Sequence, residues 1–153
     1  MNLKLIALGG LAFYVMTWVV SFVTGPLIHN GVLAEAYLAT ASFWRPALTQ
    51  IPPDMAALMP RWVVTGLVLS FVVAGLYGYV RPVIAGHGFV RGARFRLLMV
   101  LLVAATMASW TGIFNLPDKI WFWWIVEALF SYVICGGVLG WVADRWCAPK
   151  ASA

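Results

Sequence analysis

Charged side chains are scarce in this chain of 153 residues, of which only 10% are charged while 63% are hydrophobic. Soluble proteins have about 25% charged and about 45–50% apolar residues. A composition this far from the soluble balance excludes an ordinary water-soluble domain and predicts a membrane protein. Strand-like alternation of polar and apolar residues is also missing. The spans are therefore predicted to be helices, which satisfy their backbone hydrogen bonds internally in lipid.

Cysteine and histidine are equally rare, with two of each in the sequence. Cys135 and Cys147 do not form a CxxC pair, and about 18 Å would separate them along a helix. His29 and His87 are expected on opposite sides of the membrane, so they cannot bind one haem or metal together. We therefore predict no disulfide, no metal site and no cofactor.

Groups for catalysis are also lacking. No histidine is expected at membrane depth, so a serine of the spans would have no base beside it to act as a nucleophile. No pattern of residues indicates hydrolysis, phosphoryl transfer or redox chemistry. We accordingly expect a protein that is not an enzyme.

Four apolar segments are long enough to cross a membrane, since about 20 residues rising 1.5 Å each span a hydrocarbon layer of about 30 Å. They are residues 5–27, 62–80, 97–114 and 120–142. We expect the first span to be retained, because it is too long for a signal peptide and has no clear cleavage site. The predicted fold is all-α: an integral membrane four-helix bundle forming a single membrane domain over residues 1–153.

The segment 32–59 between the first two spans is too patterned to be a plain loop. Apolar and aromatic residues from Leu33 to Trp44 recur every three or four positions, which predicts an amphipathic helix that Pro46 ends. We expect this helix to lie along the outer membrane interface, where aromatic rings are favourable.

Basic residues are unevenly shared between the loops, with seven on one side of the membrane and three on the other. The richer side comprises Lys4, Arg81, Arg91, Arg94, Arg96, Arg145 and Lys150. Because cytoplasmic loops carry the excess of Lys and Arg, both termini and the basic loop 81–96 are predicted in the cytoplasm of a bacterium, with the protein in its inner membrane. We expect Arg81, Arg91, Arg94 and Arg96 to contact anionic lipid headgroups, and we expect no nucleic-acid partner.

Glu127 is the one charged residue within the apolar run 121–142. An ionised carboxylate near the membrane interior costs several kcal/mol, so its side chain must face other helices or water, or keep its proton. The outer halves of the spans offer it more polar groups than the inner halves. Those groups are Thr17, Ser21, Thr24, Thr65, Thr106, Ser109, Thr111 and Asn115.

This asymmetry predicts a polar cluster or pocket in the outer half of the bundle, with Glu127 near its floor. The predicted members are Glu127, Ser131, Ser21, Thr17, Thr65 and Ser109, and the predicted outer rim is His29, Tyr37, Trp44, Arg45 and Arg61. A purely structural role, in which the hydrogen bonds of Glu127 hold the bundle in register, stays open.

Gly136 and Gly140 lie near the face of the fourth span opposite to Glu127. Their GxxxG spacing allows another backbone to approach closely. We expect helix packing at this face, either within one chain or through a homodimer or a membrane-protein partner.

The stretch LIHNGVLAEAYLATASFWRP resembles a motif of a widespread group of small, uncharacterised bacterial four-span proteins. The matching positions are His29, Gly31, Val32, Leu33, Tyr37, Thr40, Ala41, Trp44, Arg45 and Pro46. Asn30 interrupts the His-Gly pair of the motif, and Phe43 replaces a Leu. The resemblance implies the four-span architecture and a Glu in the last span matching Glu127, and it implies no activity.

The leading functional hypothesis is a small accessory or interaction subunit whose polar outer half receives a partner or a small ligand. One alternative is a channel or transporter in which Glu127 binds a proton, a cation or a small solute. Another is a membrane enzyme acting on lipid or quinone, with His29 and Arg45 near the headgroups.

Overall fold

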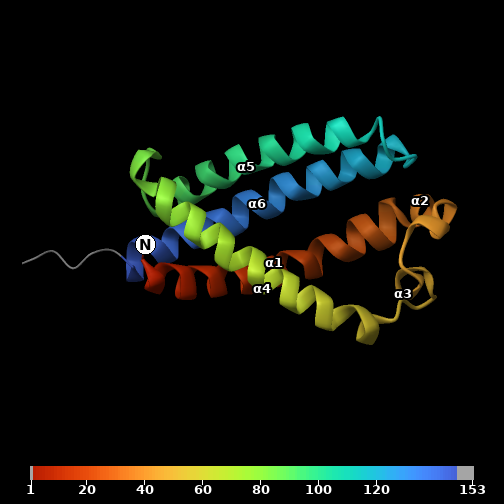
Figure 1. The fold of residues 1–153 in the computed structure, drawn as a ribbon, viewed down its shortest axis with the longest axis horizontal. Helices are drawn as coiled ribbons and strands as arrows, with labels where there is room; N and C mark the ends of the chain where they lie inside the picture. The colour runs from red at the N-terminus through yellow and green to blue at the C-terminus, as the bar shows by residue number, and fades with distance from the viewer. Residues whose placement is uncertain (1, 148–153) are drawn as a thin grey trace, which may run out of the picture.

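The computed structural model describes residues 2–147, within which every regular element is a helix. Four stretches are long and apolar enough to cross a membrane, and they form the four-helix bundle shown in Figure 1. They are Leu5–Val32, Met55–Val83, Gly88–Trp110 and Asp118–Trp146. The all-α prediction is therefore confirmed. Lys150, which contributes to the predicted charge bias, lies outside the described residues.

The first long stretch combines three helical segments in sequence. A π-helix, η1 (Leu5–Gly9), leads into α1 (Gly10–Thr24), and a second π-helix, η2 (Gly25–Val32), continues it. The helix thus runs five residues beyond the predicted end of the first span, which alters where His29 lies.

The second long helix, α4 (Met55–Val80), begins seven residues before the predicted start of the second span. The Asp54 carboxylate accepts a hydrogen bond from the backbone N–H of Ala57 at 3.1 Å and so caps this helix. Pro60 lies inside the helix. A proline in the second turn removes only one intrahelical hydrogen bond, so the early turns persist.

The third helix, α5 (Gly88–Trp110), begins nine residues before the predicted start of the third span and ends before residue 114. Much of the predicted basic loop 81–96 is therefore helical: only the short 3-10 helix η4 (Arg81–Val83) and the residues up to His87 connect the helices. The fourth helix, α6 (Asp118–Trp146), also exceeds its predicted range at both ends.

The segment between the first two long helices is not one amphipathic helix. It contains α2 (Ala34–Ala39), the 3-10 helix η3 (Ala41–Phe43) and α3 (Pro46–Thr49). The break comes at Thr40, whose hydroxyl donates to the carbonyl of Ala36 at 2.7 Å. Such side-chain bonds compete with the helical backbone pattern. Pro46 begins α3, as a proline at a first helical position commonly does.

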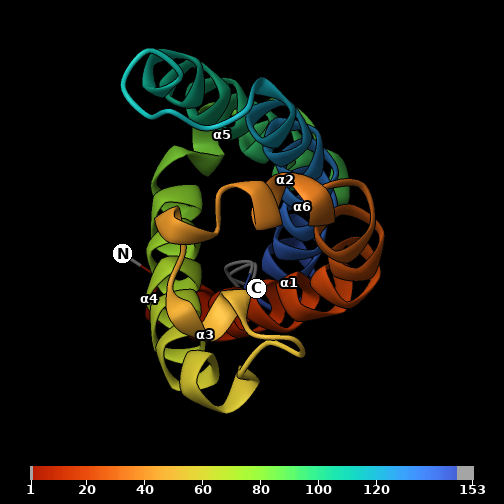
Figure 2. The ribbon, with the colours of Figure 1, turned by 90° about the vertical axis from the view of Figure 1, so that its right-hand side faces the viewer.

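The short helices lie at one end of the bundle, which we call the α2 end (Figures 1 and 2). The two ends of the described chain meet at the opposite end, where the Asn2 side chain donates to the carbonyl of Cys147 at 3.1 Å. We call it the Asp144 end. An even number of long helices brings the chain back to the side on which it began.

Helices α5 and α6 run side by side along the bundle (Figure 1). Glycines form the contact between them: a Cβ on Gly92 would lie 1.9 Å from the carbonyl oxygen of Gly136, and a Cβ on Gly140 would lie 2.7 Å from the nitrogen of Gly92. The GxxxG face of α6 is thus covered by α5 of the same chain, which is the first of the two arrangements that the sequence leaves open.

Asp144 joins three segments at its end of the bundle. Its carboxylate accepts hydrogen bonds from Arg81 and from the backbone N–H of Gly88, and Arg91 lies 3.6 Å from it. Gly88 has a φ of +46°, which favours glycine. These bonds fasten the α4–α5 connection and the start of α5 to α6.

Arg96 lies in the interior instead of at a headgroup layer, with 4% of its surface exposed. Its guanidinium carbon is 3.8 Å from the centre of the Tyr132 ring and 5.0 Å from that of Phe13. Aromatic faces attract a desolvated cation, so this contact links α5, α6 and α1.

Of the four arginines expected at lipid headgroups, only Arg94 is exposed, and it donates to the carbonyl of Ala85 at 3.0 Å.

The glycine contact predicts that Gly92→Ala destabilises the bundle, because its new Cβ would overlap the α6 backbone. Overpacking of this kind costs about 1–3 kcal/mol. Gly112→Ala is the matched control, since its Cβ would have no neighbour closer than 3.9 Å. The free energy of unfolding in mixed micelles measures both variants. Equal stability of Gly92→Ala and the wild type would contradict the contact.

Candidate functional site

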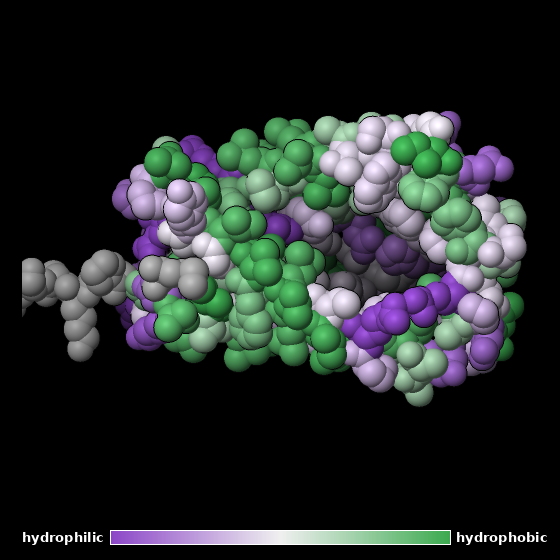
Figure 3. Space-filling view, viewed as in Figure 1, coloured by the Kyte–Doolittle hydropathy of each residue, from purple (hydrophilic) through white to green (hydrophobic). Residues whose placement is uncertain are grey.

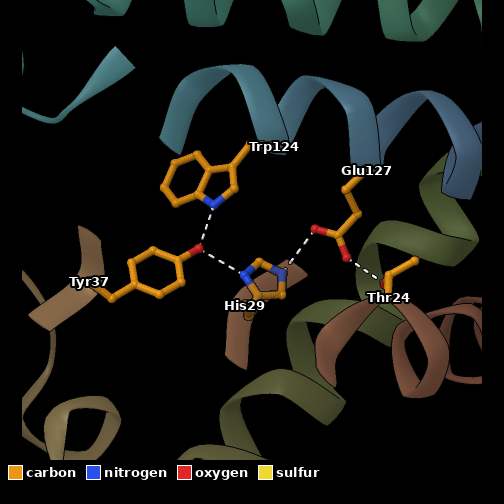
Figure 4. Close-up of polar contacts among 5 residues, drawn as sticks. All are labelled: Thr24, His29, Tyr37, Trp124 and Glu127. Atoms are coloured by element: carbon orange, nitrogen blue, oxygen red, sulfur yellow. Dashed lines mark hydrogen bonds and ion pairs between the residues drawn. The ribbon is translucent and has the colours of Figure 1, made fainter. Parts of the chain in front are cut away.

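The Glu127 carboxylate is held by two side chains of the first long helix. Glu127 lies nine residues after the start of α6, or about 14 Å along the helix from the α2 end. The Thr24 hydroxyl donates to its Oε1 at 2.6 Å, and Nε2 of His29 lies 2.9 Å from its Oε2 (Figure 4). The acid inside the apolar run therefore has polar partners on both oxygens.

The π-helical segment η2 carries His29 to this position. Pro26 has no backbone N–H, so the regular hydrogen-bond pattern is interrupted in this turn. The chain adopts the wider pattern, with Leu33 donating to the carbonyl of Ile28 five residues earlier at 2.8 Å. Wider turns of this kind often occur at functional sites.

Tyr37 and Trp124 extend the contacts toward α2. The Tyr37 hydroxyl lies 2.7 Å from Nδ1 of His29 and accepts a hydrogen bond from the Trp124 indole at 2.8 Å. The rings of His29 and Tyr37 also stack, with centres 5.8 Å apart. Figure 4 shows the five side chains as one connected network, which we call the Glu127 network: Thr24, His29, Tyr37, Trp124 and Glu127.

The direction of each hydrogen bond follows from the partners. Burial raises the pKa of Tyr37 above its ordinary value of 10.0, so its hydroxyl keeps its proton at neutral pH. With Glu127 ionised, a neutral His29 donates from Nε2 to the carboxylate and accepts from Tyr37 at Nδ1. Both ring nitrogens of His29 are then occupied.

The network is not sealed from its surroundings. The exposed fraction is 37% for the His29 side chain and 19% for that of Glu127. Figure 3 shows a hollow in the half of the molecule nearer to α2, between α6 and α4, with hydrophilic residues at its depth. Apolar side chains cover the same face nearer to the Asp144 end. A carboxylate and an imidazole are thus accessible within an otherwise apolar bundle.

No family model, curated protein or solved structure matches this chain. The resemblance to the group of small four-span proteins stays a prediction.

The other residues predicted for the polar cluster make no hydrogen bond to Glu127 among residues 2–147. Thr65 and Ser109 are exposed, and each donates to a carbonyl of its own helix, that of Arg61 at 2.8 Å and that of Thr106 at 2.7 Å. Thr17 bonds to the carbonyl of Phe13 and lies 3.7 Å from the sulfur of Cys135. A hydroxyl in an apolar helix finds its own backbone first, which is why these positions do not gather into one cluster.

Two predicted serines have no role in the network. Ser21 is exposed and Ser131 half-buried, and neither side chain makes a hydrogen bond among residues 2–147.

The residues predicted for the rim divide into two groups. His29 and Tyr37 belong to the network itself, and the Trp44 indole donates to Thr40 at 2.9 Å while its ring packs on Tyr37. Arg45 and Arg61 are exposed, and no ion pair involves them in the part of the chain that the structure describes.

The predicted end of the first span at residue 27 leaves His29 in a loop, whereas η2 keeps it on the helix beside α6. His29 thus lies within a stretch that is long and apolar enough to cross a membrane. Thr24 and Trp124 belong to the site although they are not among the predicted site residues. Their spacing carries a usable signal, because Thr24 lies seven residues after Thr17 and Trp124 three before Glu127, on the same helix faces.

The network predicts that Tyr37→Phe lowers stability by about 1–3 kcal/mol, because it leaves the Trp124 indole and Nδ1 of His29 without their partner. Tyr14→Phe is the control, since the Tyr14 hydroxyl makes no hydrogen bond among the described residues. It should change stability by less than about 0.5 kcal/mol. Equal losses in the free energy of unfolding would show that the Tyr37 hydroxyl contributes nothing.

Proposed function

We propose that this protein is a small integral protein of the bacterial cytoplasmic membrane, without enzymatic activity, that binds a small ligand or a segment of a partner protein in the hollow near α2. The observation that carries the proposal is the accessible Glu127–His29 pair, with Nε2 and Oε2 2.9 Å apart and part of each side chain exposed. Polar groups in membrane helices are costly, and an accessible pair is a candidate for binding. The charge bias of the loops supports cytoplasmic termini and an outward-facing hollow.

The packing of the other half supports binding over conduction. Buried side chains fill the bundle between the network and the Asp144 end, among them Phe13, Val73, Tyr77 and Leu139. The hollow lies on the side of the half nearer to α2, and the packed side chains of the other half argue against a continuous path through the bundle. The occupied ring nitrogens of His29 favour binding over catalysis, since neither is free for a substrate proton.

Accessibility of the hollow is tested by introducing single cysteines in a Cys135→Ser, Cys147→Ser background. Thiolates form and react only where water reaches them. Thr24→Cys should react with a charged, membrane-impermeant methanethiosulfonate added from the periplasmic side. Phe22→Cys, on the same helix but 76% exposed on an apolar surface, should face lipid and stay unmodified.

Equal protection of both cysteines in intact membranes would contradict a hollow that opens to water. Modification of Thr24→Cys only from the cytoplasmic side would contradict the proposed orientation and leave the hollow itself standing.

Because the half nearer to the Asp144 end is packed with side chains, we also expect proteoliposomes to show no proton flux that depends on Glu127. Wild type and Glu127→Gln should acidify equally slowly under an imposed potential, as measured with an entrapped pH-sensitive dye. A flux in the wild type that Glu127→Gln abolishes would favour the transporter alternative.

A further inference from the structure

We propose that the ligand of the hollow is an organic cation that donates N–H groups to Glu127, such as an ammonium or a guanidinium. This inference rests on the proposed function and specifies the ligand class. It follows from which hydrogen-bonding groups of the Glu127 network are already used and which are left over.

Every donor of the network is used internally. The Trp124 indole N–H goes to Tyr37, and the Thr24 hydroxyl goes to Oε1 of Glu127. The Tyr37 hydroxyl donates to Nδ1 of a neutral His29, and the single N–H of that ring donates to Oε2 of Glu127. A ligand that needs hydrogen-bond donors, such as a carboxylate or a phosphate, finds none in this arrangement.

Acceptor capacity is left over in the same groups. An ionised carboxylate offers about four lone-pair sites, of which Thr24 and His29 occupy two. The Tyr37 and Thr24 oxygens each keep at least one further lone pair. The Glu127 side chain is 19% exposed, so this residue is not closed off by the bundle. The site therefore offers hydrogen-bond acceptors and favours a ligand that donates hydrogen bonds.

Charge favours the same class of ligand. Glu127 is the one acid of the network, and no Lys or Arg side chain of residues 2–147 forms an ion pair with it. The arginines that do form ion pairs among the described residues contact Asp144 at the other end. A hydrogen bond between charged groups is stronger than one between neutral groups, and more so where water is scarce.

The test titrates the purified full chain in detergent micelles with three small probes by calorimetry, with protein-free micelles as the blank. Butylammonium combines charge with N–H donors, tetramethylammonium has charge without donors, and butyrate is an anion of similar size. We expect saturable binding of butylammonium, weaker binding of tetramethylammonium and no saturable binding of butyrate. Glu127→Gln should weaken the binding of butylammonium by about tenfold or more, because it removes a hydrogen bond to a charged group.

Glu35→Gln is the matched control variant. Glu35 is an exposed acid in the first turn of α2, so this change removes one negative charge near the same end of the bundle without altering the network. It should leave butylammonium binding unchanged. Equal weakening by both substitutions would show general charge attraction and overturn the proposal.

A second measurement leaves Glu127 in place, in case Glu127→Gln fails to fold. Butylammonium should slow the modification of Thr24→Cys by the thiol reagent, and butyrate should not. Tighter binding of butyrate, equal binding of tetramethylammonium, or no saturable binding of butylammonium would each overturn the ligand class. If Thr24→Cys is nevertheless water-accessible, the proposed binding function survives such a result.

Discussion

The structure depends on satisfying one carboxylate inside an apolar bundle. An ionised acid away from water is tolerated only when its oxygens are bonded, and Glu127 obtains those bonds from Thr24 and His29 on another helix. His29 reaches Glu127 because the first long helix continues past Pro26 as a π-helix. It also ties α2 to the bundle, because Tyr37 completes the hydrogen bonding of His29.

The two ends of the molecule are built by different means. At the Asp144 end, bare glycine backbones bring α5 and α6 together, and Arg96 is held between the rings of Tyr132 and Phe13. At the α2 end, polar side chains and aromatic edges make the contacts and leave Glu127 partly accessible. A tightly packed half thus adjoins a half in which Glu127 stays partly exposed.

Much of the fold could be predicted from the sequence, because long apolar runs leave helices as the sole choice and Glu127 is conspicuous among them. Close helix packing at Gly136 could be predicted, because a glycine has no side chain. Which helix packs there could not be predicted from the residue spacing alone. Helix ends were predicted poorly. Hydropathy falls where α5 begins at Gly88, yet Asp144 of a distant helix stabilises that end.

The candidate site could be predicted less completely than the fold. Its acid could be found from composition, and His29 was expected at its rim. The direct contact of His29 with Glu127 could not be predicted, because that requires knowing that the helix continues past Pro26 in π form. The hydroxyls of Thr65 and Ser109 are equally polar in the sequence and bond to their own helices instead. Which polar groups meet is decided by helix rotation and length, and a single sequence constrains both weakly.

The direct contact of His29 with Glu127 joins two helices, and a double-mutant cycle measures it. His29→Asn, Glu127→Gln and the double variant are compared by their free energies of unfolding in mixed micelles. We expect a coupling free energy of about 1–3 kcal/mol between the two positions. Losses that add to within about 0.5 kcal/mol would contradict it, since residues that do not interact behave additively.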